Sequence, residues 1–158
     1  MARPLRTITI GRPTTIVLLL LMTVVIALVT LWASGKAYAK VDPVPFHELK
    51  VLQEKLSEGP VPFPIFVALI SPLILNVLLF LPWGFLAFLV LDTPSRPASQ
   101  SYLLTVLLAM GLSFAVEATQ YFLPNRVTDI NDVIWNSTGA LVGAFFGHLR
   151  KRVRIAFE

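Results

Sequence analysis

Four long, mainly apolar stretches dominate this sequence, and they determine the environment in which the chain folds. No Asp, Glu, Lys or Arg occurs in residues 13–35, and the run 14–32 is rich in Val, Ile and Leu. About 20 apolar residues are enough for one helix to cross a bilayer. Since 56% of the 158 residues are hydrophobic and 14% are charged, the composition is typical of a polytopic membrane protein.

Three further apolar stretches predict three more membrane spans. The second span covers about residues 66–91 and contains Pro72 and Pro82, so we expect a kink or a local break there. The third and fourth spans cover about residues 102–122 and 131–149. The predicted fold is therefore all-α, a polytopic membrane helix bundle with four transmembrane helices over residues 14–149, between basic tails at 1–13 and 150–158.

The positions of Lys and Arg predict how the bundle is oriented. Basic segments stay on the cytoplasmic side during insertion, and here they flank the first and last spans: Arg3, Arg6, Arg12, Arg150, Lys151, Arg152 and Arg154. We expect both termini in the cytoplasm and the chain in the bacterial inner membrane. Ala37-Tyr38-Ala39 resembles a signal-peptide cleavage site, but the apolar run before it is long for a signal peptide, which favours a retained anchor.

The connection between the first two spans, residues 36–62, predicts an amphipathic helix. Phe46, Leu49, Leu52 and Leu56 recur at near-helical spacing between charged residues. Such a helix can lie on a membrane surface, and the predicted topology places it on the extracytoplasmic side. We interpret His47 as an exposed histidine and not as a ligand.

Several classes of function lack support in the sequence. With no cysteine there is neither a disulfide nor a thiolate metal site. The basic residues lie beside apolar segments and do not form a stripe interleaved with aromatic residues, so we expect membrane lipid, and no nucleic acid, as the partner. No phosphate-binding loop or catalytic motif is present. We assign no catalytic residue and expect no cofactor.

A set of polar residues near the junction of the last two spans is the candidate site. Glu117 and Gln120 are three residues apart in the third span and share one helical face. If the following helix were continuous upstream, one stripe would hold four more: Arg126, Asp129, Asp132 and Asn136. Asn76 adds an amide in the second span. Ionisable residues inside spans face the bundle interior or a water-filled cavity.

Two interpretations of this polar cluster stay open. In the first, Arg126 pairs with an acid and the amides bridge helices, so that the cluster only stabilises the bundle. In the second, the carboxyl groups of Glu117, Asp129 and Asp132 form a site near the outer leaflet that binds a cation, a proton or a polar head group. Three acids and one Arg leave at least one carboxyl group in need of another partner.

The order of three motifs resembles the VanZ-like family of membrane proteins. The motifs are Asn76-Val-Leu-Leu-Phe-Leu-Pro82-Trp-Gly84-Phe, Glu117-Ala-Thr-Gln120, and Arg126-Val-Thr-Asp129-Ile-Asn-Asp132-Val-Ile-Trp-Asn136-Ser-Thr-Gly139-Ala-Leu-Val-Gly143. They extend over a little under half of the chain. Independently of the resemblance, Gly139 and Gly143 form a Gly-x-x-x-Gly pair that allows close helix approach.

The resemblance implies an integral membrane role at the cell envelope, in a family associated with resistance to the glycopeptide teicoplanin. Three hypotheses follow for the polar cluster. It could bind a lipid-linked envelope precursor or a glycopeptide. The chain could instead be an accessory structural subunit of a larger membrane complex, with other membrane subunits as partners. A weaker third hypothesis is a metal-dependent enzyme that acts on lipid phosphates; the sequence leaves any metal unknown.

Overall fold

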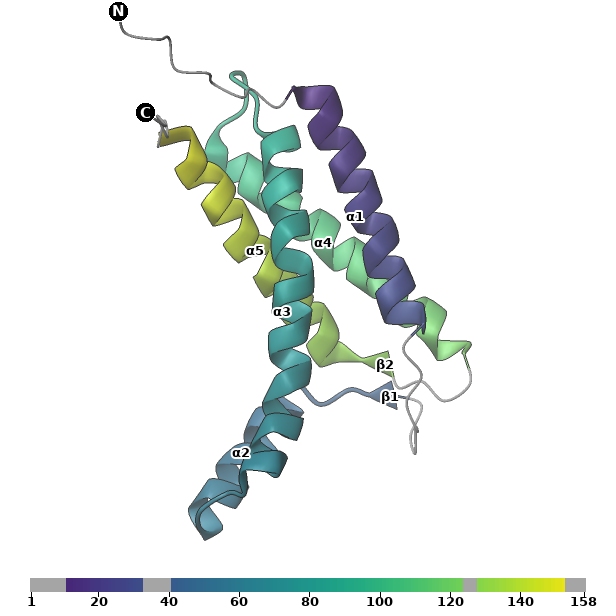
Figure 1. The fold of residues 1–158 in the computed structure, drawn as a ribbon, viewed down its shortest axis with the longest axis vertical. Coiled ribbons are helices and arrows are strands. Elements are labelled where there is room, and N and C mark those ends of the chain that lie inside the picture. Colours follow the sequence, from purple (N-terminus) through teal and green to yellow (C-terminus); the bar gives the residue numbers. More distant parts are fainter. Residues whose placement is uncertain (1–10, 33–40, 124–127, 153–158) are drawn as a thin grey trace, which may run out of the picture.

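The computed structural model describes residues 11–32, 41–123 and 128–152, and these form five helices and one pair of short strands (Figure 1). In chain order the elements are α1 (Arg12–Trp32), β1 (Val41–Asp42), α2 (His47–Glu58), α3 (Phe63–Leu91), α4 (Ala98–Tyr121), β2 (Thr128–Asp129) and α5 (Ile130–Arg152). Several predictions fall outside the described residues: the N-terminal arginines Arg3 and Arg6, the motif around Ala37, Arg126, and the last basic residue Arg154.

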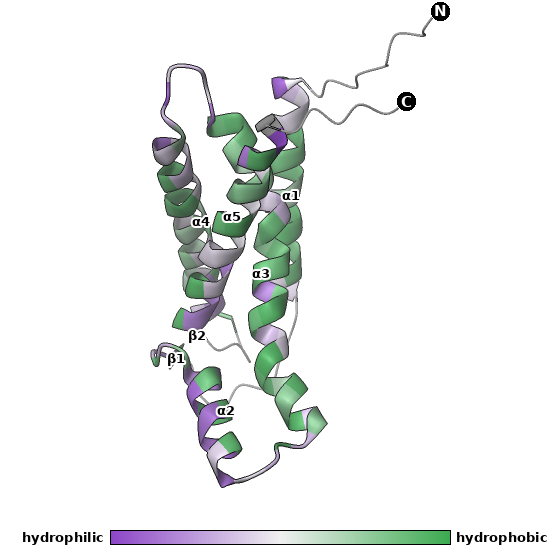
Figure 2. Cartoon of the chain, turned by 90° about the vertical axis from the view of Figure 1, so that its left-hand side faces the viewer, coloured by the Kyte–Doolittle hydropathy of each residue, from purple (hydrophilic) through white to green (hydrophobic). Residues whose placement is uncertain are grey.

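The predicted all-helical membrane fold is confirmed. Three helices, α1, α3 and α4, are long and apolar enough to cross a membrane. Helix α5 is 23 residues long, but it is not apolar enough to be counted with these three described helices. Its first turns are polar, as the hydropathy colours in Figure 2 show. The count of four spans therefore stays a prediction.

Helix α3 continues through both of its internal prolines. We expected a kink or a local break, and no break occurs, because the segment from Phe63 to Leu91 is helical throughout. A proline removes one backbone hydrogen bond, and neighbouring helices in a membrane bundle can compensate for that loss. Two arginines satisfy backbone carbonyls at the far end of the helix: Arg12 donates to the Val90 oxygen at 3.3 Å and Arg96 to the Leu91 oxygen at 2.6 Å.

Helices α3 and α5 run in the same direction, cross each other and approach closely enough for their backbones to meet (Figure 1). Glycines on both helices face backbone atoms of the other helix. A Cβ atom on Gly139 would lie 2.9 Å from Val77 Cα, and one on Gly143 would lie 2.7 Å from Phe85 N. Gly84 of α3 meets the backbone of Ala140 in the same way. Since real Cβ atoms do not approach so closely, the interface depends on these glycines.

Helix α1 packs against α3 around a small apolar core. Ile26 and Phe80 are fully buried, and Trp83 is 5% exposed. The Trp83 indole Nε1 donates to Thr23 Oγ1 at 2.9 Å, so the polar end of the ring has a partner in α1. The opposite faces of these helices expose Val, Leu and Ile, as expected of surfaces that contact lipid.

Beyond the end of α1, α2 lies beside the N-terminal part of α3, and β1 pairs in parallel with β2 (Figure 1). Helix α3 has 29 residues and is about 43 Å long, whereas the 21 residues of α1 extend for about 31 Å. A helix, α2, occupies the connection where we predicted an amphipathic helix, with Leu52 buried and Leu56 exposed. Its amphipathic character and its place on the extracytoplasmic membrane surface stay predictions.

Candidate functional site

The last turn of α4 and the first turn of α5 bring two carboxyl groups together. Glu117 is 3% exposed, and its carboxyl group lies near that of Asp132. Glu117 Oε2 also accepts the backbone N–H of Asp129 at 2.8 Å, and the Glu117 carbonyl accepts the Thr128 hydroxyl at 3.2 Å. Glu117 therefore fixes the position of β2.

Two amide side chains connect this carboxyl pair to the neighbouring helices. Asn76 Nδ2 of α3 donates to Asp132 Oδ1 at 2.5 Å. Gln120 Nε2 of α4 donates to the backbone oxygen of Thr30 at the end of α1, at 3.0 Å. The carboxyl pair is thus surrounded by contributions from α1, α3, α4 and α5.

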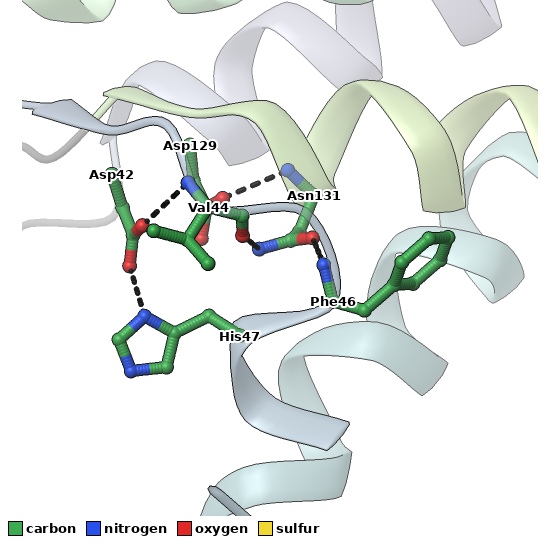
Figure 3. A network of polar contacts seen from close by, with 6 residues as sticks. All are labelled: Asp42, Val44, Phe46, His47, Asp129 and Asn131. Carbon is green, nitrogen blue, oxygen red and sulfur yellow. Dashed lines mark hydrogen bonds and ion pairs between the residues drawn. The ribbon is translucent and has the colours of Figure 1, made fainter. Parts of the chain in front are cut away.

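Asn131 holds the segment that precedes α2, as Figure 3 shows. Its side chain is 1% exposed; Oδ1 accepts the Phe46 N–H at 2.5 Å and Nδ2 donates to the Val44 oxygen at 3.2 Å. Asp42 accepts the Val44 N–H at 3.0 Å and forms an ion pair of 2.8 Å with His47. Phe46 has φ 60°, a left-handed conformation that is costly for a large side chain, and these contacts hold it there.

Asp129 lies between the carboxyl pair and this segment. Its Oδ1 accepts the Asn131 N–H at 2.8 Å. Burial raises the pKa of Asp129 to about 6, the Asn131 N–H opposes that rise, and the negative charges of Glu48, Asp132 and Asp42 add to it. Asp129 therefore changes its charge in a physiologically accessible range of pH.

Asn136 lies one turn deeper in α5 than Asp132. It is 3% exposed, and its Nδ2 donates to Ser113 Oγ of α4 at 2.8 Å. Its Oδ1 is buried without a hydrogen-bond partner among the described residues. The Asn136–Ser113 contact therefore connects α4 and α5 below the carboxyl pair.

A cavity of about 480 Å³ opens beside Glu117, between α4, β1 and the start of α5. Its walls are mainly apolar and include Phe114, Tyr121 and Val133. Three carboxyl-bearing residues line it: Asp42, Glu117 and Asp129. An apolar pocket with a few convergent polar groups is the usual form of a small-molecule site.

The structure brings most of the predicted polar cluster together and changes one part of it. Asn76, Glu117, Gln120, Asp129 and Asp132 gather at one end of the bundle, with Asn136 one turn away. The predicted helical stripe is shorter than expected, because α5 begins at Ile130 and Asp129 lies before it in β2. Arg126 lies outside the described residues.

The residues that join this cluster to the segment before α2 were not predicted from the sequence. Asn131 was assigned only to the start of a span, and Asp42 and Thr30 were given no role. Asn131 stands between Asp129 and Asp132 in a polar run, but nothing local indicates that it contacts residues 44 and 46. Within residues 11–32, 41–123 and 128–152, no group of three or more His, Cys, Asp or Glu side chains is arranged to hold a metal ion.

Comparison with known proteins identifies one family. No curated protein and no solved structure is detectably similar to the chain. A model of the family described as VanZ/LLP1 matches residues 15–151, which include every described residue of the carboxyl pair and its surroundings. The chain therefore belongs to the VanZ/LLP1 family.

Proposed function

We propose that this protein is a multi-pass inner-membrane protein of the bacterial envelope whose carboxyl-lined cavity binds the polar head of an amphiphilic ligand at the outer leaflet. The observation that carries the proposal is the cavity beside Glu117, because it joins apolar walls to three carboxyl-bearing residues. A ligand with an apolar body and a polar head matches both features.

The proposed topology has α5 as the fourth span, although its mean hydropathy is low. Its polar residues Asp132 and Asn136 contact other helices, whereas Leu141 and Phe145 are exposed on its other face. With 23 residues it extends for about 34 Å, enough to cross a hydrocarbon core of about 30 Å. Four spans and the basic flanks then place both termini in the cytoplasm and α2 on the extracytoplasmic side.

The charge of the cavity favours some ligands over others. The described residues that line it include three carboxyl-bearing side chains and neither Lys nor Arg. Carboxylates attract amines and accept hydrogen bonds from hydroxyl groups, but they repel phosphate. We therefore expect an amine-bearing or sugar-bearing head group, as in a glycopeptide or in the sugar portion of a lipid-linked precursor.

Binding to the full chain in nanodiscs tests this proposal. The probes are teicoplanin and a lipid-linked peptidoglycan precursor, each titrated against wild type, Glu117→Gln and Asp129→Asn. We expect the variants to bind at least one probe about tenfold more weakly, because each replaces a carboxyl group that lines the cavity with an amide. Glu54→Gln, an exposed change of the same kind on α2, is the matched control. Wild-type affinity in both cavity variants, or no binding of either probe to wild type, would contradict the proposal.

An accessory structural role is the second candidate, and the amide contacts favour it. Gln120, Asn136 and Asn76 each bond to another helix, as expected of residues that stabilise a membrane bundle. In that case the protein would copurify with other membrane subunits in fixed stoichiometry under mild detergent. The same Glu117 and Asp129 variants would then lower the folded yield and leave no specific binding to measure.

A further inference from the structure

A second cavity lies on the other side of the carboxyl pair. It also has a volume of about 480 Å³, and it opens between α1 and α3. Its lining is Val29, Thr30, Pro72, Leu75, Asn76, Leu78, Leu79, Gln120 and Asp132, none of which lines the first cavity. Glu117 lines the first cavity and Asp132 the second, so the carboxyl pair lies between the two spaces.

The inner end of this cavity presents hydrogen-bond acceptors. Gln120 is 5% exposed, and its Nε2 is held by the Thr30 carbonyl. Its Oε1 has no donor among the described residues. Asn76 likewise uses its Nδ2 on Asp132, and no described residue donates to its Oδ1. Neither oxygen is among the fully buried side-chain atoms that lack a partner, so a hydrogen-bond donor on a ligand in the cavity can reach both of them.

The outer rim of the same cavity is apolar and faces outward. Val29 is 51% exposed, Leu75 63% and Leu78 57%, on two helices that are both apolar enough to span the membrane. The medium that meets this rim is therefore lipid. A molecule that reaches the acceptors through the rim must have an apolar chain.

We propose that the cavity between α1 and α3 binds a membrane amphiphile laterally, with a hydroxyl or ammonium head group at Gln120 and Asn76 and an apolar chain along Val29, Leu75 and Leu78. Hydroxyl and ammonium groups share the donor chemistry that these acceptors select, whereas a carboxylate offers none. This site is distinct from the cavity beside Glu117, and the binding proposed for that cavity does not depend on it.

Photo-crosslinking in nanodiscs tests the inference with three probes of equal chain length: a diazirine-bearing long-chain alcohol, the matching amine and the matching carboxylic acid. We expect the alcohol, the amine or both to label residues 25–30 and 72–79 about tenfold more than the acid, and unlabelled dodecanol or dodecylamine to compete. The alcohol and amine arms show which donor the site prefers. Equal labelling by all three probes would mean ordinary lipid contact and would overturn the proposal.

Variants locate the contact. Gln120→Leu removes the acceptor and should lower labelling by the preferred probe about tenfold, whereas Gln120→Glu keeps an acceptor and should retain it. If Gln120→Leu does not fold, Val29→Trp at the exposed rim reduces the cavity and should lower labelling too. Leu107→Trp, on a lipid-facing part of α4, is the control. Labelling unchanged in the Gln120 or Val29 variant would refute the site.

The first cavity provides the means to tell the two proposals apart. Ala118 is exposed and lines only the cavity beside Glu117. Ala118→Trp should therefore weaken the binding proposed for that cavity while the labelling of residues 25–30 and 72–79 stays at the wild-type level. Loss of that labelling in Ala118→Trp would show that the second cavity is not a separate site.

Discussion

The replacement Gly143→Ala tests whether the contact between α3 and α5 determines the stability of the bundle. The new Cβ atom would lie 2.7 Å from Phe85 N and would also overlap the Leu81 carbonyl oxygen. To restore a distance of 3.4 Å from Phe85 N, the helices must separate by at least about 0.7 Å. Backbone on both sides cannot relax by changing a rotamer, so we expect a cost of about 3 kcal/mol from overpacking.

Alanine also has a higher helix propensity than glycine, which offsets about 1 kcal/mol of that cost. The net loss of about 2 kcal/mol corresponds to a roughly 30-fold change in the unfolding equilibrium constant. Gly111→Ala in α4 is the matched control, because a Cβ atom there meets no other atom within 4 Å.

Equilibrium unfolding in bicelles by steric trapping would measure both variants. We expect Gly143→Ala to be destabilised and Gly111→Ala to be as stable as wild type or slightly more stable. Equal stability of the two variants would refute the claim that the close backbone contact matters, since both make the same chemical change in a helix.

Three further predictions concern protonation, the outer connection and topology. The folded-state pKa of Asp129 is raised from 3.8 to about 6, so protonation of Asp129 favours the folded state. This contribution to the free energy of unfolding is complete below about pH 4 and is lost as the pH rises through 6. Between pH 4 and 6 the free energy of unfolding should therefore change less with pH in Asp129→Asn than in wild type. Asn131→Ala removes two hydrogen bonds of about 1 kcal/mol each, so amide exchange in residues 44–58 should accelerate about 10- to 30-fold by mass spectrometry, whereas exposed Gln53→Ala should have little effect. In intact cells, an impermeant maleimide should label Lys55→Cys and not Gln100→Cys, and the reverse pattern would contradict the proposed orientation.

The helices were largely predictable because membrane spans follow from local hydropathy. The stretch 14–32 and the apolar run around Asn76 correspond to α1 and α3, and the polar residues Asp132 and Asn136 of α5 contact other helices. Helix α5 is not apolar enough to be counted with these spans, because polar residues such as Asp132 and Asn136 lower its mean hydropathy, and the fourth span stays a prediction.

The contacts of the outer connection could not be predicted in the same way. Val41 pairs with Thr128, and Asn131 accepts a hydrogen bond from the Phe46 N–H. Both contacts join residues more than 80 positions apart. No local period or spacing encodes such contacts, and two-residue strands are too short to give an alternating pattern. Helix α5 begins at Ile130, so Asp129 lies in β2 and is not part of the stripe that a continuous helix would have formed.

The unequal lengths of α1 and α3 give the protein a built-in response to bilayer thickness. From Val61 to Leu91 no side chain is charged, so the apolar length of α3 exceeds that of α1. In a thin membrane the N-terminal turns of α3 would extend into water, or the helix would tilt. In a thick membrane lipid would cover these turns. Each ångström of mismatch between helix and bilayer costs a fraction of a kcal/mol. Because α2 packs on those turns, its depth relative to the lipid head groups should change with the thickness of the membrane around it.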